Sequence, residues 1–99
     1  MARTGQIRFV GGARIGSFNA TIPFARLLVE KGRATLYCFR KYELTPTNTS
    51  CEAYGSIPML SHGVRFHHID VDYPDPLIFW CIRRRNVLDA LERAGFELR

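Results

Sequence analysis

The sequence has few cysteines, the residues with which many small proteins form disulfide bonds or bind zinc. Its 99 residues include only three cysteines, Cys38, Cys51 and Cys81, and no two of them form a Cys-x-x-Cys pair. An odd, widely spaced set of cysteines indicates neither a disulfide framework nor a zinc knuckle. We therefore expect reduced, partly buried thiols, and no cofactor is indicated.

Long apolar runs are also missing. The longest purely apolar run is 77–82, and residues 1–12 contain no apolar stretch of signal-peptide length. A membrane-spanning helix needs roughly 20 apolar residues. The sequence predicts no membrane span, and together with reduced thiols this leads us to expect a cytoplasmic protein.

Lysine is scarce: 12 of the 14 basic residues are arginine, and the net charge is +5. Residues 1–41 carry eight basic side chains and one acidic one, whereas residues 42–99 carry six basic and eight acidic ones. A basic half attracts phosphate-bearing partners. Because its arginines lie at strand-like spacings with no aromatic interleaving, we expect a solvated surface here and no nucleic-acid partner.

What the sequence does contain is the composition of one folded domain. Hydrophobic residues make up 46% of the chain and charged residues 23%. That balance excludes a disordered or collagen-like chain, and the length favours a single domain over residues 1–99.

Turn signals every few residues favour an all-β chain of short strands. The clearest alternation is at 24–30, where Ala25, Leu27 and Val29 share one face. We expect turns or bends at Gly11-Gly12, near Pro23, at 31–32, 45–48, 55–58, 61–63 and 73–76. The expected strands are 6–10, 17–21, 24–30, 34–39, 50–55, 64–71 and 77–82.

Only the C-terminal segment looks helical. Asn86 is a candidate N-cap, Gly95 a candidate stop, and an apolar stripe runs through Val87, Leu88, Leu91 and Ala94. Because 77–82 is apolar on both faces, we expect a strand that is central or covered on its outer face, and this helix is the obvious cover. The prediction is a mainly β, partly open barrel of about seven strands capped by one C-terminal helix, a plan found in pleckstrin-homology-like (PH-like) domains. An oligonucleotide-binding barrel fits less well, since its helix lies between strands.

A resemblance supports this plan over nearly the whole chain. The residues that carry it are Gly11-Gly12, Gly16-Ser17, Asn19-Ala20-Thr21, Pro23-Phe24-Ala25, Leu27, 54–58, 65–68, 79–81 and Leu91-x-x-Ala94-Gly95-Phe96. In these positions the chain resembles a family of small, uncharacterised bacterial proteins with a PH-like domain. The resemblance implies the fold and brings no enzymatic activity or catalytic residues with it.

Gly11–Gly16 has the glycine spacing that opens a phosphate-binding loop. Ser17-Phe18 follows where that motif requires Lys-Ser or Lys-Thr, so the motif fails. Glycines that permit a positive φ or a close approach of two strands explain the pattern better. The segment remains a loop carrying Arg14.

The stretch 67–72 looks most like a metal site. In a strand, His68, Asp70 and Asp72 would project from one face and could share a cation. All three candidate ligands come from one expected strand, and the sequence indicates no further ligand from another strand or helix. A polar outer face is therefore the favoured interpretation, and we predict no metal site.

Arg83, Arg84 and Arg85 come directly before the expected helix. Three guanidinium groups beside the free N–H groups of a helix start suit phosphate or sulfate. The alternative is that they stay in water, with Arg85 pairing to Asp89 one turn later. We take this cluster, with Arg14, as the candidate anion or partner site.

Nothing in the sequence indicates catalysis. A nucleophilic triad needs a Ser or Cys within reach of a His, yet Ser61 and His62 are only neighbours in an expected turn. Aromatic residues such as Phe66 and Phe79 are expected in the core, and Trp80 is a candidate for lining a groove.

Two functional hypotheses follow. The first is a non-catalytic PH-like module that binds a protein or peptide, through an exposed strand edge or by self-association. The alternative is binding of an anionic headgroup or phosphate ligand by Arg83, Arg84 and Arg85.

Overall fold

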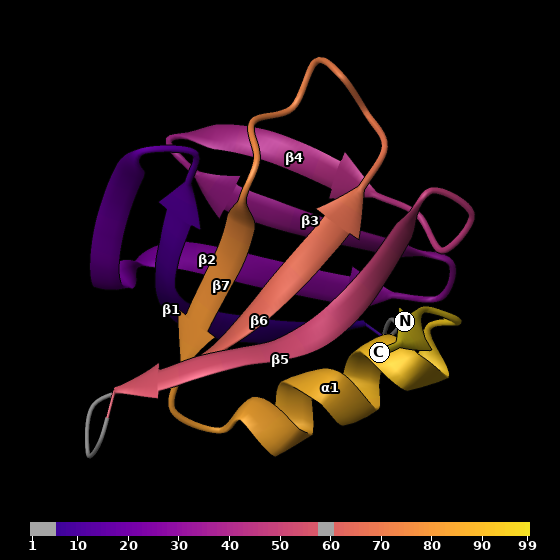
Figure 1. Ribbon diagram of the computed structural model, residues 1–99. Helices are drawn as coiled ribbons and strands as arrows, with labels where there is room; N and C mark the ends of the chain where they lie inside the picture. Colours follow the sequence, from indigo (N-terminus) through magenta and orange to yellow (C-terminus); the bar gives the residue numbers. More distant parts are fainter. Residues whose placement is uncertain (1–5, 58–60) are drawn as a thin grey trace.

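The computed structural model describes residues 6–57 and 61–99, which form one curled sheet and one helix (Figure 1). The elements are β1 (Ile7–Ile15), β2 (Phe18–Glu30), β3 (Arg33–Cys38), β4 (Arg40–Leu44), β5 (Thr49–Ile57), β6 (Ser61–His68), β7 (Leu77–Cys81), α1 (Arg84–Arg93) and β8 (Glu97–Leu98). The sheet order is β4-β3-β2-β1-β7-β6-β5-β8. Only β5 and β8 pair in parallel. The predicted mainly β, partly open barrel with a C-terminal helix is confirmed.

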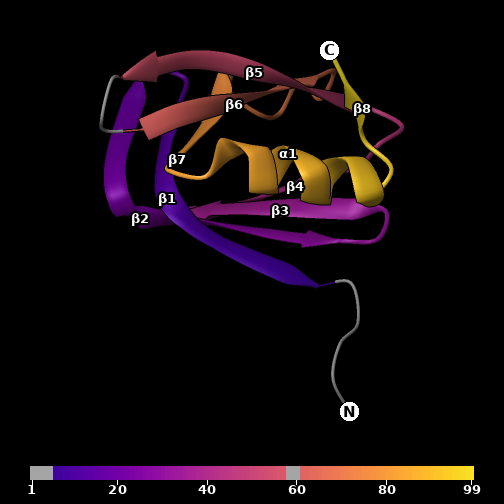
Figure 2. The same cartoon turned by 90° about the horizontal axis from the view of Figure 1, so that it is seen from below.

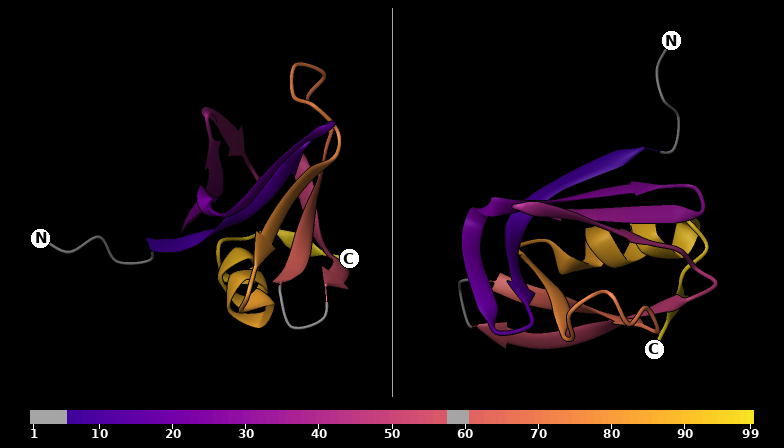
Figure 3. Two further views of the ribbon diagram at one scale, coloured as in Figure 1. Left: turned by 90° about the vertical axis from the view of Figure 1, so that its left-hand side faces the viewer. Right: turned by 90° about the horizontal axis from the view of Figure 1, so that it is seen from above.

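Two antiparallel meanders, β1–β4 and β5–β7, meet where β1 pairs with β7. In the left view of Figure 3 they meet near the top and diverge downward, with α1 between their lower ends. Along β2, Ala25, Leu27 and Val29 are buried while Phe24 and Arg26 are exposed, as the alternation predicts.

Helix α1 packs on the concave side of the sheet, between the two arms (Figure 2). Its Val87 and Leu91 join Phe66 and Phe79 in the hydrophobic core. The prediction that it covers the outer face of β7 was wrong. Ile78 on that outer face is buried between Arg14 and Arg65 of the neighbouring strands, and arginine stems readily cover apolar surface.

The expected stops at Gly11-Gly12 and near Pro23 are also wrong, because β1 and β2 each run through them. A Cβ on Gly11 would lie 2.0 Å from the Trp80 carbonyl oxygen, and one on Gly12 would lie 2.4 Å from that of Ala20. Close strand approach therefore explains this glycine pair. Pro23 lies in an irregularity of the β1–β2 pairing, where residues 21–24 of β2 lie opposite Gly12 alone. Because this stretch is not regularly paired, the N–H group that proline lacks is not missing from the hydrogen-bond ladder.

Two other expected turns differ in the structure. The segment 61–63 belongs to β6, where Gly63 faces Tyr54 and Trp80 on either side. Gly55 has a φ of +57° inside β5 and marks a register shift, whereas Pro58 lies outside the described residues. The remaining expected turns, at 31–32, 45–48 and 73–76, fall between strands.

The strand expected at 64–71 ends at His68. Beyond it the Asp70 side chain accepts a 2.9 Å hydrogen bond from the Asp72 N–H, a local turn that competes with pairing. Neither β4 nor β8 was predicted. β4 does carry a short alternation, in which buried Tyr42 and Leu44 follow exposed Lys41 and Glu43, and the prediction missed it. β8 has only two residues, too few to show an alternation.

The helix starts earlier than its sequence suggests. Arg83 occupies the N-cap position without a side-chain cap hydrogen bond, and Asn86 lies inside the first turn. The other end agrees with prediction, because Gly95 follows the C-cap with a φ of +108°. Within the described residues, no helix has the length and apolarity to cross a membrane.

Candidate functional site

A groove of about 710 Å³ lies where the start of α1 meets β5. Its lining consists of Ala53, His62, Ile82, Arg83, Arg84, Arg85, Asn86, Leu88, Asp89 and Leu98. All three candidate arginines are thus present, together with a strand edge and a histidine that the sequence did not connect to them.

The first turn of α1 leaves backbone donors free. The N–H groups of Asn86 and Val87 donate to the Arg83 carbonyl, but among the described residues those of Arg84 and Arg85 have no acceptor. The first turn contains no acidic residue. The positive end of the helix dipole is therefore uncompensated at this groove.

The three arginines differ in their contacts. One Nη of Arg84 donates to the Gly55 carbonyl at 2.8 Å and approaches the Gly63 carbonyl at 3.4 Å, which ties the helix start to β5 and β6. Arg83 and Arg85 are exposed, and no described residue forms a hydrogen bond or ion pair with their side chains. Only these two are therefore available to a ligand without breaking a contact.

The one carboxylate in the groove does not neutralise them. Asp89 lies one helical turn after Arg85, the spacing that favours an ion pair. The four ion pairs among the described residues all lie elsewhere, so the Arg85–Asp89 pair that the spacing allows is not formed.

His62 adds a buried polar atom to the groove. Its Nδ1 is buried and has no hydrogen-bond partner in the described part of the chain. A buried polar group without a partner costs roughly 1–3 kcal/mol, so this nitrogen is an unsatisfied hydrogen-bonding group beside the groove.

The free edge of β5 forms the opposite wall. Cys51 uses its outer edge to pair with β8 and accepts a 2.7 Å hydrogen bond from the Arg99 N–H. Because edge-facing groups alternate along a strand, Ala53 presents its N–H and C=O on the same edge, beyond the end of β8. Cys51 is buried, whereas Ala53 is exposed and lines the groove.

Comparison of the chain with protein-family models, curated proteins and solved structures finds no match.

Two residues predicted with this site lie apart from it. The Nε of Arg14 donates to the Gly16 carbonyl at 3.1 Å, at the β1–β2 turn. Trp80 is half-buried on the outer face of β7, with its ring centroid 6.4 Å from that of Tyr54, and lines none of the three described pockets. The sequence could not show this separation, since it depends on which strands pair.

The stretch 67–72 gathers no metal ligands. His68 ends β6 and its Nε2 lies 2.9 Å from the Pro74 carbonyl oxygen, while Asp70 and Asp72 belong to the following turn. A search of the described residues finds no group of three that could hold a metal ion. The expectation that these three side chains project from one face of a strand is therefore wrong.

The cysteines behave as predicted, since all three are buried and free. Burial raises the pKa of the Cys51 thiol to about 12 and that of Cys81 to about 11, with Arg84 slightly lowering the latter. Thiols this hard to ionise are poor nucleophiles at neutral pH.

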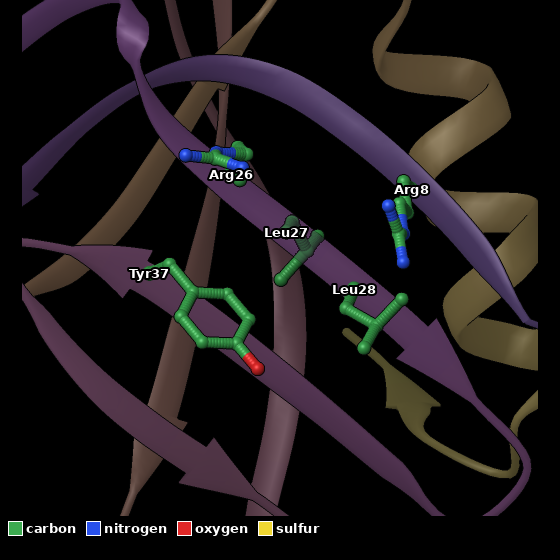
Figure 4. A pocket seen from close by; sticks show the side chains of 5 residues that line it. All are labelled: Arg8, Arg26, Leu27, Leu28 and Tyr37. Carbon is green, nitrogen blue, oxygen red and sulfur yellow. The ribbon is translucent and has the colours of Figure 1, made fainter.

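Two smaller pockets were not predicted. One, of about 570 Å³, opens at the barrel mouth, where Phe18 and Phe39 form an edge-to-face pair with centroids 5.6 Å apart. The other, of about 260 Å³, lies on the convex face of β1–β3 between Arg8, Arg26, Leu28 and Tyr37 (Figure 4).

Proposed function

We propose that this protein is a non-catalytic binding module that takes an extended, acidic segment of a partner protein into the groove between β5 and α1. The strand order supports the resemblance to PH-like domains, because two meanders joined through β1 and β7 precede a C-terminal helix.

One observation carries the proposal: a free strand edge and a free helix start form two walls of the same groove. An extended peptide gains main-chain hydrogen bonds by adding to an exposed edge, here through the N–H and C=O of Ala53. Leu88 and Leu98 give the groove apolar surface for alternate side chains of that peptide.

Charge sets the chemistry of the partner. Arg83 and Arg85 have no acidic counterpart within ion-pair distance in the described part of the chain, and the adjacent N–H groups are unoccupied. A carboxylate placed there would receive charge-assisted hydrogen bonds and complement the helix dipole. An acidic side chain or a terminal carboxylate of the peptide is the expected anchor.

The second candidate is a small anionic ligand at the same helix start. The free N–H groups of Arg84 and Arg85 favour it, since such groups bind phosphate without a strand edge. The two candidates differ in whether Ala53 contributes.

The test is fluorescence anisotropy with a labelled decapeptide that alternates glutamate with valine and threonine, against a lysine-containing peptide of the same design. We expect the acidic peptide to bind and Arg83→Ala/Arg85→Ala to weaken binding at least about tenfold, corresponding to about 1.4 kcal/mol. Ala53→Pro removes the edge N–H while keeping a residue that edge strands tolerate, and should also weaken binding.

The matched control is Lys31→Ala/Arg93→Ala, which removes two exposed charges outside the groove. An equal loss of peptide binding in this control would show that net charge alone causes the effect, and would contradict the proposal. Binding of inorganic phosphate that needs Arg83 and Arg85 but is unaffected by Ala53→Pro, with no peptide binding, would favour the second candidate instead.

A further inference from the structure

We propose that the convex face of β1, β2 and β3 binds single-stranded nucleic acid, with Arg8 and Arg26 holding phosphates and Tyr37 stacking on a base. The site is separate from the groove at α1 and does not depend on the function proposed for that groove.

The register brings together residues that are distant in sequence. Arg26 faces Val10 on β1 and Tyr37 on β3, so its side chain shares the convex face with both. Arg8 faces Leu28 on the same side of the sheet. Strand pairing therefore places an aromatic residue beside these arginines, although none alternates with them along the sequence. The absence of such aromatic residues was the argument against a nucleic-acid partner, and it no longer holds.

These two arginines are the uncommitted charges of this part of the face. The other cations there are paired, Arg33 with Glu30 at 2.9 Å and Lys41 with Glu43 at 3.4 Å. Within the described residues, no carboxylate forms an ion pair or hydrogen bond with Arg8 or Arg26. Both side chains are exposed, so an incoming phosphate displaces no existing contact.

The spacing suits successive phosphates. Arg8 and Arg26 are diagonal cross-strand neighbours, whose Cβ atoms lie about 7 Å apart. That distance is comparable to the separation of adjacent phosphates along an extended nucleic-acid strand. A guanidinium can also hold a phosphate by two parallel hydrogen bonds.

The surface beside the arginines suits a base and sugar. Tyr37 is 41% exposed and stands directly opposite Arg26, so a base over its ring would place the attached phosphate beside that arginine. Half-buried Leu28 provides apolar surface next to the ring (Figure 4). The pocket of about 260 Å³ is smaller than the roughly 300–1,000 Å³ of small-molecule sites, so a ligand bound here would extend beyond it, as a strand does.

The experiment measures anisotropy of fluorescein-labelled dT15 between 25 and 200 mM NaCl. We expect binding that weakens with salt, and Arg8→Ala/Arg26→Ala should reduce the magnitude of the log–log salt slope by about 1.4, the contribution of two single-strand phosphates. Tyr37→Leu should weaken binding at least about fivefold without changing that slope, because stacking is independent of counterion release.

The charge-matched control is Lys31→Ala/Arg93→Ala, which removes two exposed cations that line neither pocket and should leave dT15 binding within about twofold. An equal loss in both double variants would show attraction to net charge alone and overturn the proposal. So would unchanged affinity in Tyr37→Leu, equal affinity for a 15-base-pair duplex, or no binding at 25 mM NaCl. Because Arg8 and Arg26 are exposed, circular dichroism should show an intact fold, and Arg8→Gln/Arg26→Gln provides a second pair with similar side-chain volume.

Discussion

The backbone N–H of Glu43 donates a 3.0 Å hydrogen bond to the phenolic oxygen of Tyr73, across the open side of the half-barrel. Glu43 belongs to edge strand β4, while Tyr73 lies in the loop between β6 and β7. The Tyr73 ring also packs edge-to-face on Tyr42, with centroids 5.2 Å apart. A side chain therefore occupies an edge N–H group that would otherwise be open to pairing with another chain.

We predict that Tyr73→Phe lowers the free energy of unfolding by about 1 kcal/mol, the usual value of one hydrogen bond. Tyr73→Ala should cost more because the ring contact is also lost. Urea unfolding measures both. Tyr37→Phe is the matched control, since no described residue bonds to the Tyr37 hydroxyl, and an equal loss there would contradict this role for Tyr73.

The three groove arginines should differ in their effect on stability. Arg84→Ala removes the 2.8 Å hydrogen bond to Gly55 and should destabilise the protein by about 1 kcal/mol, a value reduced by its partial exposure. Arg83→Ala and Arg85→Ala should be neutral or slightly stabilising, because cations near a helix start are unfavourable. Thermal melting of the three variants at low salt gives the comparison, and three equal losses would contradict it.

Replacing Gly11 or Gly32 by alanine tests whether each glycine is required by close packing or by its backbone conformation. Gly11→Ala would place a Cβ 2.0 Å from the Trp80 carbonyl oxygen and should cost about 3 kcal/mol or prevent folding. Gly32 has a φ of +77° but nothing within 4 Å of its Cβ position, so Gly32→Ala should cost only about 1 kcal/mol. A smaller loss in melting temperature for Gly11→Ala than for Gly32→Ala would contradict this assignment.

The buried thiols make stability fall at high pH. Burial raises the pKa of Cys51 to about 12, so the folded chain holds this proton in a range where the unfolded chain releases it. Stability is full below the unfolded pKa near 9 and decreases above it, by up to about 1.4 kcal/mol per pH unit for this thiol. Guanidinium unfolding of wild type and Cys51→Ala from pH 8 to 10.5 should show a shallower decline in the variant, and parallel declines would contradict the assignment.

Most elements could be predicted as strand or helix from the sequence, because the signals for them are local. The alternation at Ala25, Leu27 and Val29 predicts a half-buried strand, and the spacing of Val87 and Leu91 predicts an amphipathic helix that ends at Gly95. Together with the position of the helix after the strands, these signals were enough for a mainly β, partly open barrel.

The candidate sites could not be assembled from the sequence, because each depends on which strands are neighbours. The arginine cluster at 83–85 was visible in the sequence, but its division into a tethered Arg84 and two free neighbours follows from the carbonyls of Gly55 and Gly63. Likewise, Tyr37 meets Arg26 only through the β2–β3 register. A register is fixed by closure of the whole sheet over its core, a long-range condition that local periodicity does not contain.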